Sequence, residues 1–294
     1  MKNELNKRLL NNHPCFSEEA HKKFGRLHLP VAPACNIQCN YCIRKFDCVN
    51  ETRPGVTSRV LKPSEAIERV RVIMERGGSG LSVIGIAGPG DPLANDSTFE
   101  TLEPIHREFP EMILCISTNG FLLPERLDGL LECGVESVTI TINALTAQTA
   151  QRIYSSAFYE GKRLTGEEAA AKLLHNQWSG LSRALAAGLA VKINSIFIPG
   201  VNEDEIQMIA FNASRMGAEI MNVMPLIPQA GFKDIPRPSC GMLNEMREKC
   251  RAYMPQMTHC KQCRADAFGL LGGDGDMELE MLHSRLGEDY CENV

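Results

Sequence analysis

The sequence predicts an α/β fold, a partial TIM-like (β/α)6 barrel with an extension at each end. Two observations predict it. Short apolar and β-branched runs alternate six times with longer amphipathic stretches, the pattern of parallel strands with covering helices. The length of 294 residues suits one large domain. Six strands are fewer than the eight that close a full barrel, so we expect an open barrel.

The expected strands cover residues 27–31, 81–86, 112–117, 137–142, 190–197 and 219–224. The expected helices cover residues 64–76, 97–108, 124–133, 167–187, 203–216 and 242–253. Gly134 and Gly188 each follow one of these helices as a C-cap signal. The chain thus divides into an N-terminal arm (1–26), a core barrel (27–226) and a C-terminal extension (227–294).

The composition is that of an ordinary globular protein, with 44% hydrophobic and 23% charged residues. No apolar run reaches about 18 residues, so we expect no membrane span. The first residues lack the apolar core of a secretory signal, which favours the cytoplasm. Twelve cysteines in a reducing compartment then indicate metal rather than disulfides. A net charge of −5 argues against nucleic acid as the main partner.

Cys35, Cys39 and Cys42 follow the first expected strand, and we call residues 35–42 the cluster loop. Three thiolates on one short loop can hold three corners of a cubane iron–sulfur cluster and leave the fourth iron open to a small molecule. A structural zinc site is the weaker interpretation, because no fourth ligand lies close by in sequence. The spacing, with Tyr41 before the last cysteine, resembles the signature of the radical S-adenosylmethionine (SAM) enzymes.

Polar or glycine-rich residues recur where the expected strands end, which is where α/β folds place their functional residues. A glycine-rich loop, residues 87–93, follows the second strand. Turn chemistry alone explains such loops. It does not explain polar side chains inside strands, which would face the barrel interior and need partners there. These side chains are Ser117, Thr141, Asn143 and Asn194.

Further cysteines are candidate metal ligands. Strand alternation puts Cys115 on the same face as Ser117, where it either points into the barrel or packs as a small hydrophobe. Cys260 and Cys263 form a Cys-x-x-Cys pair without a thioredoxin-like surrounding, which favours ligation over redox exchange. We interpret four other thiols as structural or incidental: Cys133, Cys240, Cys250 and Cys291.

The N-terminal arm is polar and indicates a surface segment. It carries His13, Cys15 and His21, a spacing compatible with metal binding or with an unremarkable terminus. Since the arm must run close to one end of the first strand, we expect it near the cluster loop, which favours metal binding.

Several motifs in one order resemble the NifB family of nitrogenase cofactor biosynthesis. They are His13-Pro-Cys-Phe-Ser-Glu-Glu-Ala-His21, the stretch from His28 to Cys42, Cys48-Val-Asn-Glu51-x-Arg-Pro-Gly-Val, the loop 87–94 and Cys260-x-x-Cys-Arg-Ala-Asp-Ala. The resemblance runs from about residue 13 to about residue 269. It implies an enzyme that fuses two [4Fe–4S] clusters with a SAM-derived carbide and an added sulfur into NifB-co, an [8Fe–9S–C] precursor. The implied steps are methyl transfer to a cluster sulfide and hydrogen abstraction by a radical from a second SAM.

The resemblance also assigns roles to residues. Cys35, Cys39 and Cys42 match the ligands of the SAM-binding cluster, and Gly88, Gly90 and Asp91 stand where the family's loop meets the methionyl amino group. Ser117, Asn119, Thr141, Asn143 and Asn194 are candidates for further SAM contacts. The substrate clusters would be held by Cys15, His28, Cys48, Cys115, Cys260 and Cys263.

The family also implies partners: an iron–sulfur cluster donor, an electron donor such as ferredoxin, and a carrier that receives NifB-co. Many members have an additional C-terminal carrier domain, and because this chain ends without one we expect a separate carrier. Two alternatives remain, a radical SAM maturase acting on a peptide and a non-enzymatic cluster scaffold. The glycine-rich loop argues against the scaffold, which needs no SAM site.

His28 carries the sharpest of these assignments. By default a histidine in a buried strand is a core residue satisfied by a backbone carbonyl. However, the nearby thiols are too few to ligate two further cubanes. Leu27 and Leu29 should face the helices, so His28 should face the barrel interior. We therefore expect His28 to coordinate a substrate cluster through one ring nitrogen, with His13 and His21 as the alternatives.

Overall fold

The structure is a computed structural model that describes residues 2–50, 57, 59–76 and 80–272. The motif residues 51–56, Cys291 and residues 273–294 of the C-terminal extension lie outside the described residues. A seven-stranded sheet in the order β10-β1-β3-β4-β5-β8-β9 forms the centre. Its strands are β1 (Gly25–His28), β3 (Leu81–Ile86), β4 (Ile113–Thr118), β5 (Val135–Thr141), β8 (Ala190–Phe197), β9 (Ile220–Pro225) and β10 (Phe268–Gly269).

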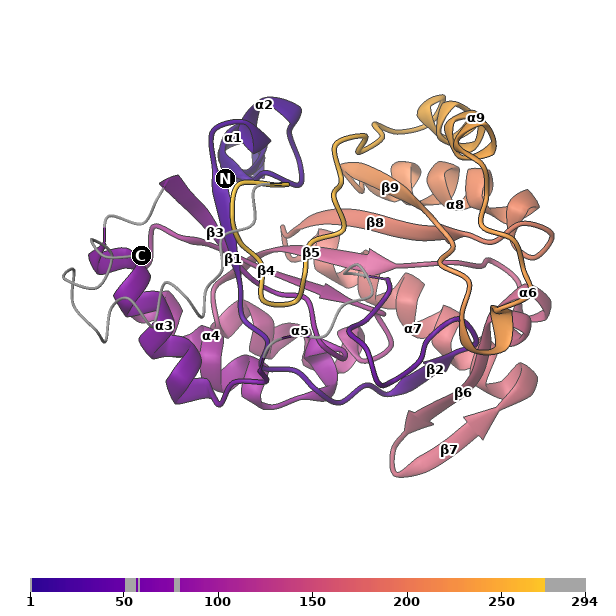
Figure 1. Ribbon diagram of the computed structural model, residues 1–294, viewed down its shortest axis with the longest axis horizontal. Coiled ribbons are helices and arrows are strands. Elements are labelled where there is room, and N and C mark those ends of the chain that lie inside the picture. The colour runs from indigo at the N-terminus through magenta and orange to yellow at the C-terminus, as the bar shows by residue number, and fades with distance from the viewer. Residues whose placement is uncertain (1, 51–56, 58, 77–79, 273–294) are drawn as a thin grey trace, which may run out of the picture.

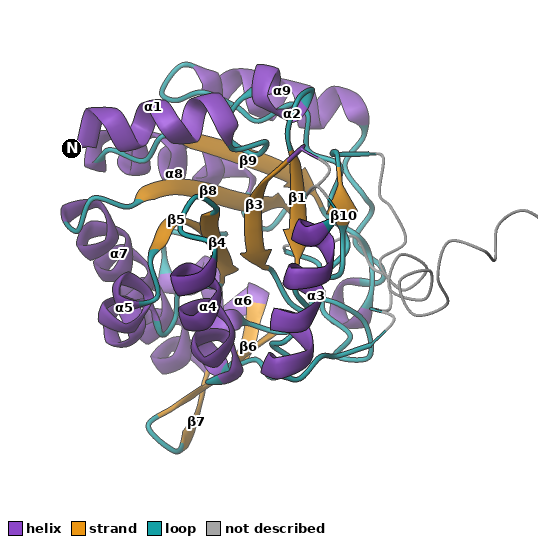
Figure 2. Cartoon of the chain, turned by 90° about the vertical axis from the view of Figure 1, so that its left-hand side faces the viewer, coloured by secondary structure: helices purple, strands orange, loops and turns teal. Residues whose placement is uncertain are grey.

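Six of these strands run parallel, and only β10 pairs antiparallel, with β1. Helices cover the outside of the curled sheet (Figure 2). They are α3 (Pro63–Glu75), α4 (Ser97–Glu108), α5 (Leu123–Glu132), α7 (Gly166–Ala186) and α8 (Glu203–Met216), with α9 (Cys240–Arg251) beyond the sixth parallel strand. The open six-unit barrel predicted from the sequence is confirmed.

The main core lies between the sheet and these helices. Leu27 and Leu29 belong to it, together with Ile84 and Ile86 of β3. These residues alternate with side chains that face the other side of the sheet, as period-two strands require. The prediction that Leu27 and Leu29 face the helices is therefore confirmed.

The N-terminal arm lies on the surface, as expected, but several of its side chains are buried. It forms helix α1 (Lys2–Asn12) and a short α2 (Glu18–His21). Leu9 is 1% exposed and Phe16 5%, and both pack against residues at the beginnings of strands, such as Ile113 and Ile220. The arm precedes β1, so it reaches the sheet at the amino ends, opposite the end from which the cluster loop leaves. Burial of its few apolar residues there stabilises it.

A second, three-stranded sheet holds the cluster loop. It has the order β2-β6-β7, with β2 (Ile37–Cys39), β6 (Tyr154–Tyr159) and β7 (Lys162–Thr165). The β6–β7 hairpin projects from the barrel (Figure 1) and follows the short helix α6 (Ala147–Ile153). Glu160 and Gly161 at its tip both have positive φ, at 48° and 75°, as a tight hairpin turn demands. Backbone pairing of β2 with β6 fixes the segment that carries Cys39.

The C-terminal extension closes the open side of the barrel. Met257 N donates to Met221 O of β9 at 2.7 Å, and His28 N of β1 donates to Ala267 O at 2.8 Å. Residues 255–269, which we call the closing segment, thus join both edges of the parallel sheet; Figure 1 shows this segment in yellow, crossing toward β1. This crossing brings Cys260 and Cys263 to the barrel interior.

In the described part of the chain, no helix combines the length and the apolar character needed to cross a bilayer.

Candidate functional site

Two cavities contain nearly all of the predicted site residues. The first, the loop cavity, lies at the carboxyl ends of the strands beside the cluster loop. Its wall includes all three loop cysteines and, from other segments, the following residues: Cys48, Asn50, Pro89, Gly90, Asp91 and Asn119. Three thiols from one loop thus face a wall of backbone and polar side chains.

Backbone hydrogen bonds join the glycine-rich loop to the residues just before the cluster loop. Gly90 N donates to Ala32 O at 2.5 Å, and Asp91 N donates to Ala34 O at 2.8 Å. A Cβ at Gly90 would lie 2.2 Å from Ala34 O, which no side chain tolerates. Gly90 is therefore required for the two loops to lie together.

The Asp91 carboxylate holds this arrangement to the end of β4. It accepts hydrogen bonds from Leu93 N, Thr118 Oγ1 and Asn119 N, the last at 2.6 Å. Asn119 in turn donates through Nδ2 to Asn36 Oδ1 and contacts Cys35 Sγ at 3.7 Å. The carboxylate is thus committed to the protein, and the predicted contact of Asp91 with SAM remains a prediction.

Burial dominates the electrostatics of the loop cavity. It raises the pKa of the Cys35, Cys39 and Cys42 thiols, while Arg44 opposes the rise. Arg44 donates to Ile37 O and to Gln38 Oε1, which holds its guanidinium beside the loop. Metal binding here must therefore displace protons from buried thiols, and Arg44 favours the thiolates. Sequence reasoning missed Arg44, although its position two residues after Cys42 was visible.

The second cavity, the interior cavity, lies inside the barrel. Three segments supply its thiols and His28: the arm, the parallel strands and the closing segment. Its wall includes the following predicted residues: Cys15, His28, Cys115, Ser117, Asn194, Cys260 and Cys263. Cys115 therefore faces the barrel, which settles the choice that the sequence left open. His28 faces the interior as well, as strand parity predicted.

A glycine creates room between two of these side chains. In the sheet register His28 of β1 is paired with Gly85 of β3, and Gly85 is paired with Cys115 of β4. A Cβ at Gly85 would lie 2.8 Å from Cys115 Sγ and 3.3 Å from His28 Cδ2. The imidazole and the thiol therefore flank a strand position that has no side chain. Sequence reasoning missed Gly85, whose signal was a glycine inside an otherwise apolar strand.

Hydrogen bonds fix the tautomer of His28. Its Nδ1 lies 3.1 Å from Arg264 O, and because a carbonyl only accepts, Nδ1 carries the proton. Nε2 of the neutral ring then carries a lone pair, the state in which histidine binds metal. The backbone carbonyl expected for an ordinary core histidine is therefore present, as Arg264 O. It occupies Nδ1 only and is compatible with iron ligation through Nε2.

Two buried cations lie close to the thiols of the interior cavity. Lys192 on β8 is buried in the wall. Burial raises the pKa of Cys115 to about 12 and that of Cys263 to about 11, and nearby cations oppose both rises, Lys192 for Cys115 and Arg26 for Cys263. Arg26 Nε donates to Cys263 Sγ at 3.3 Å. The net shift favours the protonated thiols, and the two cations make their deprotonation by a bound metal less costly.

One asparagine lies between the two cavities. Asn50 lines the loop cavity, and its backbone oxygen accepts a hydrogen bond from Asn194 Nδ2, which lines the interior cavity, at 3.2 Å. Its Oδ1 accepts from Tyr41 Oη, which itself accepts from Asn143 Nδ2, both at 2.7 Å. The two cavities therefore share a hydrogen-bonded wall.

Some predicted residues lie elsewhere than expected. Asn143 lies in neither cavity wall and is bonded to Tyr41 and to Ile196 N. Thr141 is buried and also lies outside both walls. Cys48, expected with the substrate ligands, lines the loop cavity instead. Within the described ranges, no three His, Cys, Asp or Glu side chains converge as ligands of one metal ion, so the predicted ligand roles remain predictions.

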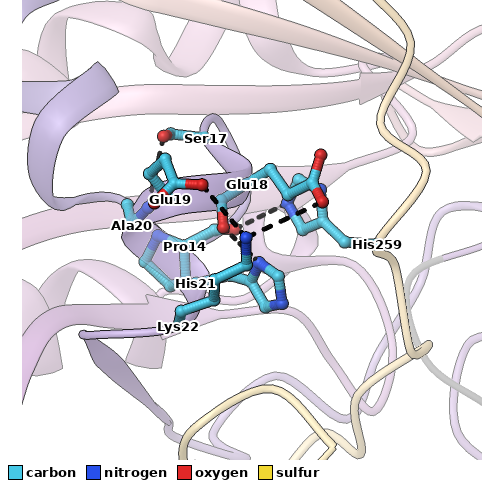
Figure 3. Close-up of polar contacts among 8 residues, drawn as sticks. All are labelled: Pro14, Ser17, Glu18, Glu19, Ala20, His21, Lys22 and His259. Carbon is cyan, nitrogen blue, oxygen red and sulfur yellow. Dashed lines mark hydrogen bonds and ion pairs between the residues drawn. The ribbon is translucent and has the colours of Figure 1, made fainter.

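His21 lies outside both cavities, where it joins the arm to the closing segment (Figure 3). Its ring stacks on His259 with centroids 4.7 Å apart, and His259 Nε2 donates to Pro14 O at 2.9 Å. Burial lowers the pKa of His259, which favours the neutral ring. These contacts hold Cys15 and Cys260 on the same side of the barrel.

The sequence comparisons identify the class of protein. The model of the radical SAM superfamily matches residues 29–212, so the chain belongs to that superfamily. Membership implies a [4Fe–4S] cluster and SAM as cofactors, and the thiol set of the cluster loop fits them. A solved radical SAM methyltransferase from Sphaerobacter thermophilus has a TM-score of 0.52 and 19% identity, covering 79% of this chain and 64% of that one. This likeness supports the fold alone.

Within the superfamily, the chain is similar to FeMo cofactor biosynthesis protein NifB. The Klebsiella pneumoniae protein is 48% identical over 277 residues, covering 92% of this chain and 59% of the relative. The Chlorobaculum tepidum protein is 44% identical over 266 residues, covering 90% and 62%. The resemblance to NifB predicted from the motifs is confirmed. The chain spans about three fifths of the length of these relatives.

Proposed function

We propose that this chain carries out the NifB reaction, in which two [4Fe–4S] substrate clusters, a SAM-derived carbide and an added sulfur form the [8Fe–9S–C] precursor NifB-co. The observation that carries the proposal is the interior cavity. Four thiols and two imidazoles from three segments line it, next to the cavity of the three loop cysteines. The three loop cysteines are enough to hold the cluster that cleaves SAM, so this second set of sulfur ligands supports the binding of further clusters.

In this proposal Cys35, Cys39 and Cys42 hold the resident cluster. When bound, the cluster and SAM supply the methyl group and the radical that removes hydrogen from it. The chain positions the substrates and excludes water, which is the protein's share in cofactor chemistry. The substrate clusters are bound by Cys15, His28, Cys115, Cys260 and Cys263. Cys48, which lines the loop cavity, binds the substrate cluster that lies nearer to SAM.

The proposed partners follow from this chemistry. An iron–sulfur cluster donor supplies the substrates, an electron donor such as ferredoxin reduces the resident cluster, and a carrier receives the product. We further propose that the reaction takes place in the cytoplasm, where these thiols remain reduced.

The test is isotopic. Anaerobically reconstituted protein receives dithionite and SAM labelled with ¹⁴C in its methyl group, and label is measured in the isolated cluster product. We expect label in an iron–sulfur product that activates cofactor-free nitrogenase. Deoxyadenosine formation with no label in any cluster would refute the proposed function but not the superfamily assignment.

A further inference from the structure

His13 is a buried histidine that the sequence analysis names only as an alternative to His28 and that the proposed ligand set does not include. It lies at the end of α1, is 3% exposed and lines the interior cavity together with His28. Its ring packs edge-on against Phe16, with centroids 4.9 Å apart. The ring is therefore held in place within the cavity wall.

The hydrogen bond of His13 is opposite in sense to that of His28. The backbone N–H of Cys15 donates to His13 Nδ1 at 3.1 Å, so Nδ1 is the acceptor and Nε2 of the neutral ring carries the proton. This Nε2 is buried and has no hydrogen-bond partner within the described part of the chain. A buried N–H without an acceptor is costly, which indicates that a ligand supplies one.

We propose that His13 donates a hydrogen bond from Nε2 to a sulfide of the substrate cluster and does not ligate iron. The inference rests on the proposed function, because it needs a cluster in the interior cavity. The two histidines then have different roles at the cluster. His28 offers a lone pair to iron, and His13 offers a proton to sulfur. His13 is thus a positioning residue that stabilises the anionic sulfide.

Ligation by His13 would disturb the arm itself. For Nε2 to bind iron, the proton would have to move to Nδ1. The Nδ1–H would then face the Cys15 N–H, and the hydrogen bond between them would be lost. That N–H immediately precedes the Cys15 side chain, which lines the same cavity. The hydrogen bond that orients Cys15 therefore also assigns the donor role to His13.

The first experiment is ¹⁵N-histidine NMR on the full cluster-free chain, with two-bond nitrogen–proton correlations assigned by His13→Leu and His28→Leu. We expect His13 protonated at Nε2 and His28 protonated at Nδ1. Protonation of His13 at Nδ1 would overturn the inference.

The second experiment uses the Cys35/Cys39/Cys42→Ala background, in which only substrate clusters remain after reconstitution. Hydrogen bonds to cluster sulfur raise the reduction potential. In pulsed EPR, a ring nitrogen of His28 bound to iron should give a strong nitrogen coupling. We expect His13→Leu to retain iron and this coupling, while the midpoint potential of the substrate cluster becomes more negative. His13→Gln, which keeps an N–H at a similar reach, should restore the potential, and His28→Leu should lose the coupling.

The outcomes separate the two claims. Loss of the nitrogen coupling in His13→Leu, or equal potentials in the Leu and Gln variants, overturns the donor role and leaves the proposed function standing. If the background protein binds no iron, the proposed function fails and the donor role fails with it.

Discussion

The loop cavity and the interior cavity are built in different ways. The loop cavity takes three of its four thiols from one stretch of eight residues, residues 35–42, and strand pairing fixes this stretch from one side. The interior cavity draws its thiols and imidazoles from residues 13 to 263 and exists only when the arm and the closing segment dock. The first cavity is thus a local motif set on a scaffold, whereas the second is a product of the complete tertiary fold. Changes in one should leave the other working.

The largest expected effect comes from the closing segment. Cys260→Ala or Cys263→Ala should lower iron content and abolish formation of the cofactor precursor, while SAM binding remains near that of the wild type. Each change removes a thiol that lines the interior cavity and not the loop cavity. Iron analysis, SAM-binding calorimetry and the labelling assay check this. Cys240→Ala, an exposed cysteine, is the matched control. If both variants keep full iron and full product, the pair has no role in the reaction.

Gly90→Ala should damage the loop cavity alone. The new Cβ would lie 2.2 Å from Ala34 O, so the glycine-rich loop must move away from the cluster loop. We expect SAM binding and deoxyadenosine formation to fall about 10-fold or more, the equivalent of an overpacking cost of about 1–3 kcal/mol. Iron in the interior cavity should not change. Normal SAM binding by this variant would show that the contact between the two loops is dispensable.

Gly85→Ala is the reciprocal change. Its Cβ would crowd Cys115 Sγ at 2.8 Å and fill the space beside His28, again at a cost of about 1–3 kcal/mol. Iron beyond the resident cluster should fall, whereas SAM binding should remain. Gly241→Ala is the control, because its nearest neighbouring atom lies 3.8 Å away. Equal iron in the two variants would argue against the space over Gly85 as part of the binding site.

The smallest effect is expected outside both cavities. Burial raises the pKa of Glu205, but hydrogen bonds from Leu145 N, Thr146 and Thr149 lower it by more, so the net shift is downward. A lowered folded-state pKa adds stability above the unfolded pKa of about 4.3, and that stability is lost as pH falls through the folded value. Glu205→Gln should therefore cost about 1 kcal/mol at pH 7 and nothing in strong acid. Urea unfolding at both pH values measures this. A pH-independent difference would exclude the charge as its cause.

The sequence was a good guide where the signal is local. The strands at 81–86 and 190–197 and the helices at 97–108 and 203–216 were predicted with their observed bounds, because their periodicity is strong and their ends carry turn or cap residues. Strand parity also placed His28 correctly, although for Cys115 it left two orientations open. In both cases the information lies within a few neighbouring residues.

Long-range docking could not be predicted in this way. The burial of the arm depends on Leu9 and Phe16 meeting the beginnings of distant strands, and the closing segment depends on backbone pairing at both sheet edges. Asn143 looked like a ligand contact because it is polar in a strand, yet Tyr41 satisfies it from another loop. The roles of Gly85 and Lys192 depend on which residues lie next to them on neighbouring strands, and the sequence does not show this. Such relations depend on tertiary structure.

The most direct test of the central claim, that two separately built cavities hold separate clusters, is iron and sulfide quantitation with EPR on the reconstituted Cys35/Cys39/Cys42→Ala variant beside the wild type. The variant should lose about four irons, those of one cubane, and all SAM cleavage. It should retain the remaining iron and the EPR signal of clusters in the interior cavity. Loss of all iron, or deoxyadenosine formation at the wild-type rate, would contradict the account.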